Sequence, residues 1–233
     1  MISRDYLCNR IDSAVREHNM IEDGDRILVG VSGGKDSTSL LDLLKYRLAY
    51  SHEKYEIAAV HIVGDARGGD IEFYKPLEQW FINEGVQYHI RKLHVPENEN
   101  LPMNCERCRW NRKKTIFEIA DELKCNKIAL GHNRDDFAQT ALMNMFMHGV
   151  FESMPFVANY FDGRFFLIRP LAYVGNKYLE SYARQMNFPI IPNECPAADF
   201  SKRQSTRDLM KIIEKDFKYA SRNIMKALLE NKD

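Results

Sequence analysis

The stretch Ile27–Ser39 reads Ile-Leu-Val-Gly-Val-Ser-Gly-Gly-Lys-Asp-Ser-Thr-Ser, and the rest of the chain is organised around it. Its apolar run, Ile27–Val31, has the composition of a fully buried strand. The leucine-rich pattern that follows predicts a helix to about Ala49. Gly33 and Gly34 let the backbone turn sharply between the two and approach a ligand closely. Because the N–H groups at a helix N-terminus are unpaired and carry the helix dipole behind them, this stretch predicts an anion site.

Polar side chains in the turn strengthen this interpretation. Ser32, Lys35 and Ser37 add hydrogen-bond donors, and Asp36 can cap the helix or hold a magnesium ion bridged to phosphate. The spacings of the Walker loop and of the Rossmann fingerprint do not occur here, and an ordinary glycine-rich turn is the alternative. Ser-Gly-Gly-Lys-Asp-Ser resembles the PP-loop of the ATP pyrophosphatase superfamily, whose members split ATP between its α- and β-phosphates and generally make an adenylated substrate.

Length and charge bound the class of protein. A chain of 233 residues fits one sizeable domain with appendages. Lys and Arg number 33, as do Asp and Glu, so no global charge favours nucleic acid or membrane. Since we find no signal peptide and no apolar run that could span a bilayer, we expect a cytoplasmic protein with no membrane partner. We divide the chain into an N-terminal helix (1–25), a PP-loop domain (26–190, with a cysteine-bearing loop at 95–108) and a C-terminal cysteine loop with helices packed on the same domain (191–233).

Strand and helix patterns alternate along the chain, which predicts an α/β fold with a doubly wound parallel sheet of the PP-loop type and extra terminal helices. After the first strand, we expect strands at Tyr55–Val63, Val86–Leu93, Lys127–Gly131 and Phe165–Ile168. The other expected helices are Ser3–Met20, Ile71–Glu84, Arg109–Leu123, Asp135–His148, Lys177–Met186, Gln204–Phe217 and Ala220–Leu229. The loops after the strands should gather at one edge of the sheet, where ligands bind in such folds.

A second motif, Gly131-His-Asn-Arg-Asp-Asp136, ends one expected strand and starts a helix. Paired carboxylates at a helix N-terminus suit magnesium coordination or helix capping. Capping alone is the alternative interpretation. We expect Asp136 to serve metal binding or catalysis and Asp135 to be the cap.

The cysteines form a third group. Five cysteines in a chain without a signal peptide argue against a disulfide framework and favour metal binding or catalysis. Cys105 and Cys108 can both reach one ion, which leaves zinc, a redox dithiol and an iron–sulfur cluster open. With Cys195, three loop thiolates without a fourth fit a 4Fe-4S cluster with one open iron, although Cys195 could instead be a lone reactive or structural thiol. We expect Cys8 and Cys125 to be buried apolar residues.

Together the motifs resemble one family closely. Ser-Gly-Gly-Lys-Asp-Ser, Cys-x-x-Cys and Ile-Ala-Leu-Gly-His-Asn-Arg-Asp-Asp, followed by Ile168–Tyr173 and Phe188–Pro192, are similar to the tRNA 2-thiocytidine synthetase (TtcA) family. The resemblance implies a PP-loop fold, ATP and Mg²⁺, a 4Fe-4S cluster on Cys105, Cys108 and Cys195, sulfur insertion into a tRNA base, and a homodimer. The chain departs from the family in keeping only the last cysteine of the usual second pair. It also lacks the usual Asp after the second strand, where His61 begins His-Ile-Val.

Basic residues gather beside the cysteines. Those near the first pair are Arg107, Arg109, Arg112, Lys113 and Lys114, and those after Cys195 are Lys202, Arg203 and Arg207. Such local clusters are typical of contacts with an RNA phosphate backbone, so we expect them to bind tRNA. Solvated helix faces are the alternative, because the net charge is zero.

The sequence therefore predicts an ATP-dependent, iron–sulfur-dependent tRNA sulfurtransferase that adenylates a pyrimidine C2 oxygen and replaces it with sulfur from a donor such as a cysteine desulfurase. The expected catalytic residues are Lys35, Asp36 and Asp136, with Mg²⁺ on the two aspartates. The expected ATP contacts are Ser32, Gly33, Gly34, Lys35, Asp36, Ser37, His61, Gly131 and His132. A PP-loop amine ligase like lysidine synthetase, which would not need the cysteines, and a non-catalytic ATP-binding iron–sulfur sensor are the alternatives.

Overall fold

The structure, a computed structural model, describes residues 2–68, 71–191 and 202–230. Its centre is a six-stranded sheet in the order β3-β2-β1-β4-β6-β5. The strands are β1 Arg26–Gly30, β2 Glu56–Val63, β3 Gln87–Lys92, β4 Lys127–Leu130, β5 Val157–Tyr160 and β6 Phe165–Ile168. The helices are α1 Arg4–Glu17, α2 Lys35–Leu48, α3 Lys75–Glu84, α4 Cys105–Glu122, α5 Arg134–His148, η1 Pro170–Tyr173 (a 3-10 helix), α6 Asn176–Met186, α7 Lys202–Asp216 and α8 Ala220–Glu230.

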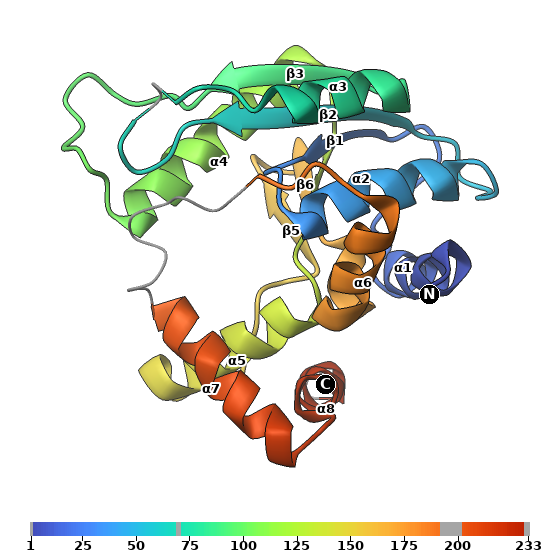
Figure 1. Ribbon diagram of the computed structural model, residues 1–233, viewed down its shortest axis with the longest axis vertical. Helices are drawn as coiled ribbons and strands as arrows, with labels where there is room; N and C mark the ends of the chain where they lie inside the picture. The colour runs from blue at the N-terminus through green and yellow to red at the C-terminus, as the bar shows by residue number, and fades with distance from the viewer. Residues whose placement is uncertain (1, 69–70, 192–201, 231–233) are drawn as a thin grey trace.

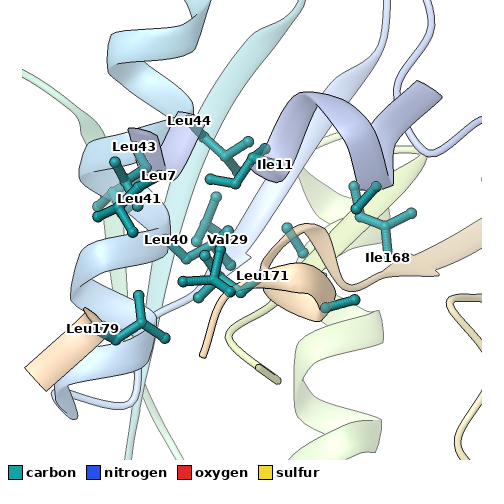
Figure 2. Packing of buried hydrophobic residues seen from close by; sticks show 14 of the residues in the cluster. Leu7, Ile11, Val29, Leu40, Leu41, Leu43, Leu44, Ile168, Leu171 and Leu179 are labelled. Atoms are coloured by element: carbon teal, nitrogen blue, oxygen red, sulfur yellow. The ribbon is translucent and has the colours of Figure 1, made fainter. Parts of the chain in front are cut away.

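Residues of the central strands alternate between two cores because successive side chains of a strand point to opposite faces. Ile27 and Val29 pack in a cluster with α1, α2, α3 and α6, whereas Leu28 packs in a second cluster under α4. Figure 2 shows Val29 of β1 beside Leu40 of α2 and Leu171 of η1. The doubly wound α/β fold predicted from the sequence is confirmed, with helices on both faces of the sheet.

The sheet is not wholly parallel, and here the sequence interpretation missed a strand. β5 pairs antiparallel with β6 at the edge of the sheet. The two strands join at Phe161–Gly163, where all three residues have positive φ. Val157–Tyr160 is only four residues long and Asn159 interrupts its apolar residues, so the sequence gives little indication of a strand.

Two helix starts also differ from expectation. α3 begins at Lys75 rather than Ile71, with Pro76 in its first turn, where proline is favoured. α4 begins at Cys105 rather than Arg109, because the Asn104 side chain caps it by accepting a hydrogen bond from the Arg107 N–H at 2.8 Å. Cys105 and Cys108 therefore lie in the first turn of a helix and not in a loop.

The C-terminal helices α7 and α8 lie against α5 (Figure 1). α5 starts at the carboxyl end of β4, so this contact brings the start of α7 to the edge of the sheet that carries the PP-loop. No helix within the described ranges is long and apolar enough to cross a membrane.

Candidate functional site

The PP-loop is a tight turn between β1 and α2 that its own hydroxyl groups hold closed. Gly33 has φ +81°, a left-handed conformation that favours glycine. The Ser37 hydroxyl accepts a hydrogen bond from the Ser32 N–H at 3.0 Å and donates to the Gly34 carbonyl at 3.0 Å. Gly34 is the N-cap of α2 without a capping side chain. The first turn of α2 is therefore arranged to bind an anion through its backbone N–H groups.

Gly131, at the end of β4, lies directly against this first turn. A Cβ atom at Gly131 would lie 2.9 Å from the Ser37 nitrogen and 3.0 Å from the Asp36 carbonyl carbon. Both neighbours are backbone atoms, which cannot move aside like the end of a side chain. Glycine at this position is what allows the ends of β1 and β4 to form one site.

A segment from the far end of the chain also lies on the PP-loop. The Ile191 N–H donates to the Gly33 carbonyl at 2.8 Å, and a Cβ atom at Gly33 would lie 2.3 Å from Ile191 Cδ1. Cys195, the third predicted cluster ligand, follows four residues later and lies outside the described residues.

The Lys35 ammonium group is held by two partners. It donates to both carboxylate oxygens of Asp36, at 2.8 and 2.9 Å, and to Asn176 Oδ1 at 2.6 Å. Burial raises the pKa of Asp36 and the Lys35 charge opposes this shift. Asn176, the first residue of α6, was not predicted as a site residue. Its contact with Lys35 spans 141 residues of sequence, which a single sequence does not reveal.

The paired aspartates of α5 have different roles from those expected. The cap is Asn133, whose side chain accepts from the N–H groups of Asp135 and Asp136, while Asp136 Oδ2 accepts from the Asn133 N–H at 2.9 Å. The expectation that Asp135 caps α5 is wrong, since Asp135 Oδ2 instead accepts from the N–H of Asn176 at 2.7 Å and anchors α6. The other oxygen of Asp136 accepts from Arg203 Nη2 at 2.6 Å.

The contact between Arg203 and Asp136 gives Arg203 a different role from the one expected. Arg203 was grouped with the RNA-binding side chains, but in the structure it reaches the carboxylate that we predicted to hold magnesium. The start of α7 is therefore joined to the PP-loop edge by an ion pair that is partly shielded from solvent, with the Asp136 side chain 13% exposed.

Two histidines lie at the same edge. His61 is buried at the carboxyl end of β2, and its Nδ1 lies 2.7 Å from the Val31 carbonyl, so it supports the strand that leads into the PP-loop. Burial lowers its pKa. His132 follows Gly131, and its Nδ1 is buried without a hydrogen-bond partner. Burial, followed by the positive charge of Arg169, lowers the pKa of His132 to about 4.

The first cysteine pair lies on the first turn of α4, where residues three apart share a face. Cys105 is exposed and Cys108 half-buried, and neither forms a disulfide with another described cysteine. The pair thus fits two ligands of a metal cluster, although no set of three or more metal-binding side chains occurs among the described residues. Cys8 and Cys125 are buried, which confirms that part of the prediction.

Arg112 fixes this helix to the sheet. Its guanidinium donates to the carbonyl oxygens of Ile62, at 3.1 Å, and Gly64, at 2.5 Å, where β2 ends. The start of α4 consequently lies at the carboxyl edge of the sheet, the edge that carries the PP-loop (Figure 1). The PP-loop, the Gly131–Asp136 motif and the cysteine pair therefore share one edge of the sheet.

The remaining basic residues fall into two groups. Arg107 pairs with Glu99 at 2.6 Å, and the Lys113 ammonium lies 3.9 Å from the centre of the Tyr160 ring. These two side chains, like Arg112 and Arg203, already have partners within the protein. By contrast, Arg109, Lys114, Lys202 and Arg207 make no ion pair shorter than 3.7 Å with any described residue.

Comparisons with known proteins agree with this geometry. A family model described as a PP-loop domain matches residues 7–211. A protein of Delftia acidovorans named tRNA-cytidine(32) 2-sulfurtransferase is 38% identical over 91% of this chain and 68% of its own length. One of the same name from Pseudomonas putida is 37% identical over 92% of this chain and 80% of its own.

Solved structures show the same fold. The U34-tRNA thiolase NcsA from Methanococcus maripaludis, solved with its 4Fe-4S cluster, superposes with a TM-score of 0.74 at 21% identity, covering 99% of this chain and 81% of that one. The NH3-dependent NAD synthetase of Campylobacter jejuni superposes with a TM-score of 0.52 at 13% identity, covering 99% and 95%. The match to the PP-loop model and the similarity to the curated relatives lead to one conclusion: the chain belongs to the tRNA-cytidine(32) 2-sulfurtransferase family of PP-loop proteins.

Proposed function

We propose that this protein is an ATP-dependent tRNA sulfurtransferase that adenylates the C2 oxygen of a cytidine, at position 32 of the tRNA, and replaces it with sulfur. The observation that carries the proposal is the shared edge of the sheet. There, the PP-loop, the Gly131–Asp136 motif and the first turn of α4 with its cysteine pair lie together. The curated relatives bear a name that describes this reaction.

Adenylation is the step that the PP-loop serves. The C2 oxygen forms a bond to the α-phosphorus of ATP, the bond from that phosphorus to the bridging oxygen breaks, and the electron pair leaves on pyrophosphate. The backbone N–H groups at the start of α2 and the Lys35 ammonium would stabilise the charge that develops on pyrophosphate. Lys35 then exchanges part of its contact with Asp36 and Asn176 for the phosphates.

Sulfur replaces oxygen in the second step. A carbonyl oxygen is a poor leaving group, but after adenylation it departs as AMP. Attack by sulfide at C2 and loss of AMP complete the exchange, so each turnover consumes one ATP and releases AMP and pyrophosphate. Exclusion of water from the adenylated base matters because hydrolysis would regenerate cytidine and waste the ATP.

Two metal centres would assist. Asp36 and Asp136 would hold Mg²⁺, since carboxylates beside phosphates are its usual protein ligands. Cys105, Cys108 and Cys195 would hold a 4Fe-4S cluster, as three thiolates leave one iron without a protein ligand, and that iron supplies a site for sulfide. We further expect a sulfur donor such as a cysteine desulfurase, a cytoplasmic location and a homodimer.

The tRNA would lie across α4 and the start of α7. Arg109 and Lys114 on α4 and Lys202 and Arg207 on α7 carry the charges that are least engaged within the protein. Trp110, one turn after Glu106 on α4, is 51% exposed and offers a flat face on which a base can stack.

The test is thiolation in vitro. Protein reconstituted with iron and sulfide without oxygen is incubated with ATP, Mg²⁺, sulfide and a tRNA transcript that carries C32, and the nucleosides are analysed by mass spectrometry. We expect 2-thiocytidine at position 32, AMP and pyrophosphate in equal amounts, and no thionucleoside from a transcript with U32. Cys105→Ala should abolish thiolation and lower the iron content, whereas Cys125→Ala, which removes a buried thiol, should not. Release of AMP and pyrophosphate without any thionucleoside, undiminished in Cys105→Ala, would favour an amine ligase instead.

A further inference from the structure

Arg169 is a buried cation that lacks an acidic partner. It follows β6 directly, and its side chain is 8% exposed. Its Nη1 donates to the Pro155 carbonyl at 2.5 Å, but its Nε is buried with no hydrogen-bond partner, and it forms no ion pair with any described carboxylate. A buried charge is costly unless it is paired.

The other buried cations among the described residues have acidic partners. Arg47, which is 2% exposed, contacts Asp12 at 2.7 Å and Glu53 at 2.9 Å, and Lys127 has Asp25 at 3.7 Å. The contrast with Arg169 indicates that something other than a side chain of the described residues supplies its negative charge.

The position of Arg169 identifies the class of that partner. β1, β4 and β6 are neighbouring parallel strands, and the register that pairs Ala129 with Ile168 brings Arg169 level with Leu130, just before Gly131 and His132. Arg169 therefore lies at the carboxyl edge, beside the motif that forms a site with the PP-loop. The Arg169 charge acts on His132, whose own Nδ1 is also buried and unpaired.

The geometry points to a buried anion subsite, formed by Arg169 with His132 beside it, that binds the β- and γ-phosphates of ATP. After adenylation breaks the bond between the α- and β-phosphates, the same subsite would hold the pyrophosphate. This inference rests on the proposed function. The PP-loop alone offers backbone donors and Lys35; Arg169 adds a fixed guanidinium that can contact two phosphate oxygens at once. Pyrophosphate carries more negative charge than a nucleoside 5′-phosphate, so a buried guanidinium without an acidic partner should favour pyrophosphate.

A purely structural role is the competing explanation. In that case Arg169 would serve to hold the 149–156 loop through the Pro155 carbonyl, and its loss would destabilise the fold without altering ligand binding. The two explanations differ in the sign of the stability change, because removal of an uncompensated buried charge should not destabilise the ligand-free protein.

The experiment compares Arg169→Met with wild type by calorimetric titration of pyrophosphate and of AMP and by thermal unfolding with and without pyrophosphate. We expect Arg169→Met to weaken pyrophosphate binding at least tenfold and AMP binding less than twofold. Its Tm without ligand should equal or exceed that of wild type, and the rise in Tm caused by pyrophosphate should be lost. Arg164→Met is the matched control. Arg164 is an exposed arginine just before β6, and it forms an ion pair with Asp121.

Pyrophosphate affinity within twofold of wild type would overturn the inference, as would a lowered Tm with pyrophosphate stabilisation intact. If Arg169→Met does not fold, Arg169→Lys is measured in its place. Lysine keeps the positive charge but lacks the planar guanidinium that contacts two oxygens at once, so we expect pyrophosphate binding to be at least fivefold weaker than in wild type. Wild-type affinity would again overturn the inference. None of these measurements needs tRNA or the cluster. Failure of the subsite therefore leaves thiolation by wild-type protein intact, whereas a protein that binds pyrophosphate through Arg169 but makes no 2-thiocytidine refutes the proposed function.

Discussion

For single residues, the clearest requirement of the site is a glycine, which has no Cβ atom, at position 131. Gly131 lets the end of β4 touch the backbone of Asp36 and Ser37. We expect Gly131→Ala to push β4 away from the first turn of α2, to weaken ATP binding at least tenfold and to lower the Tm by several degrees, since the clash is with backbone that cannot relax cheaply. Nucleotide titration and thermal unfolding measure both effects.

The control for this change is Gly149→Asn. Gly149 ends α5 in the left-handed conformation, with φ +70°, and a Cβ atom there would meet nothing within 4 Å. Asparagine tolerates this conformation, so the variant should bind ATP like wild type. Equal ATP affinity of Gly131→Ala and wild type would show that the close contact is unimportant.

The thiols give a second prediction at this scale. Burial raises the pKa of Cys8 to about 11, so at pH 8 this thiol stays protonated and unreactive. Burial also raises the pKa of Cys125, whereas Cys105 is exposed. In metal-free protein treated with iodoacetamide at pH 8, we expect alkylation of Cys105 within minutes, with Cys8 and Cys125 protected until the chain is unfolded. Peptide mass spectrometry gives the extent at each site, and rapid alkylation of Cys8 in folded protein would contradict its placement.

How much could be predicted from the sequence also differs by residue. The PP-loop and the Gly131–Asp136 motif are recognisable because their chemistry is local, a strand followed by glycine and polar residues at a helix start. Two residues were not predicted as site residues. Asn176 accepts a hydrogen bond from Lys35, and Arg169 is buried without an acidic partner among the described residues. Their roles come from contacts between distant segments, and a single sequence contains no signal for such contacts.

At the scale of the element, α4 carries both the cysteine pair and an aromatic surface. Arg107 covers one face of Trp110, with its guanidinium carbon 5.2 Å from the ring centre, and Glu99 holds Arg107 in place. The sequence interpretation began this helix at Arg109, because the apolar periodicity that indicates a helix starts only beyond the cysteines. The Asn104 cap adds the first turn, and so places both thiols on the helix rather than in the preceding loop.

A base of the tRNA stacked on Trp110 would change its fluorescence. The chain has two tryptophans, and the other, Trp80, packs against Phe81 and Phe188. In a Trp80→Phe background we expect saturating tRNA to quench most of the emission. We also expect Trp110→Ala to weaken tRNA binding about tenfold, from a stacking free energy of about 1–3 kcal/mol per base. Unchanged emission at a tRNA concentration that saturates a filter-binding assay would exclude the contact.

The whole molecule has a net charge of zero. Its binding to tRNA, a polyanion, must therefore depend on positively charged side chains that are not paired within the protein. Eight basic residues were predicted to bind RNA, but the structure pairs Arg107 with Glu99 and Arg203 with Asp136, fixes Arg112 to backbone carbonyls, and places Lys113 over Tyr160. The members least engaged within the protein are Arg109, Lys114, Lys202 and Arg207; of these, Lys114 lies 3.7 Å from Glu118 and Arg207 donates to Gln204 at 3.3 Å. The sequence alone could not show which of these cations the fold itself uses.

The number of basic residues that remain available to tRNA determines how strongly binding depends on salt. Each neutralised phosphate contributes about −0.7 to −0.9 to the slope of log K against log salt, so four contacts give a slope of about −3, and all eight would give about −6 or steeper. We expect the shallower value from titrations between about 50 and 200 mM salt. The double variant Lys202→Gln/Arg207→Gln should reduce the slope by about 1.5. Lys211→Gln, which removes a lysine of the same helix paired with Asp208 at 2.8 Å, should leave it unchanged. A wild-type slope near −6 would mean that tRNA draws Arg107, Arg112, Lys113 and Arg203 out of their contacts, and that the fold rearranges when it binds its substrate.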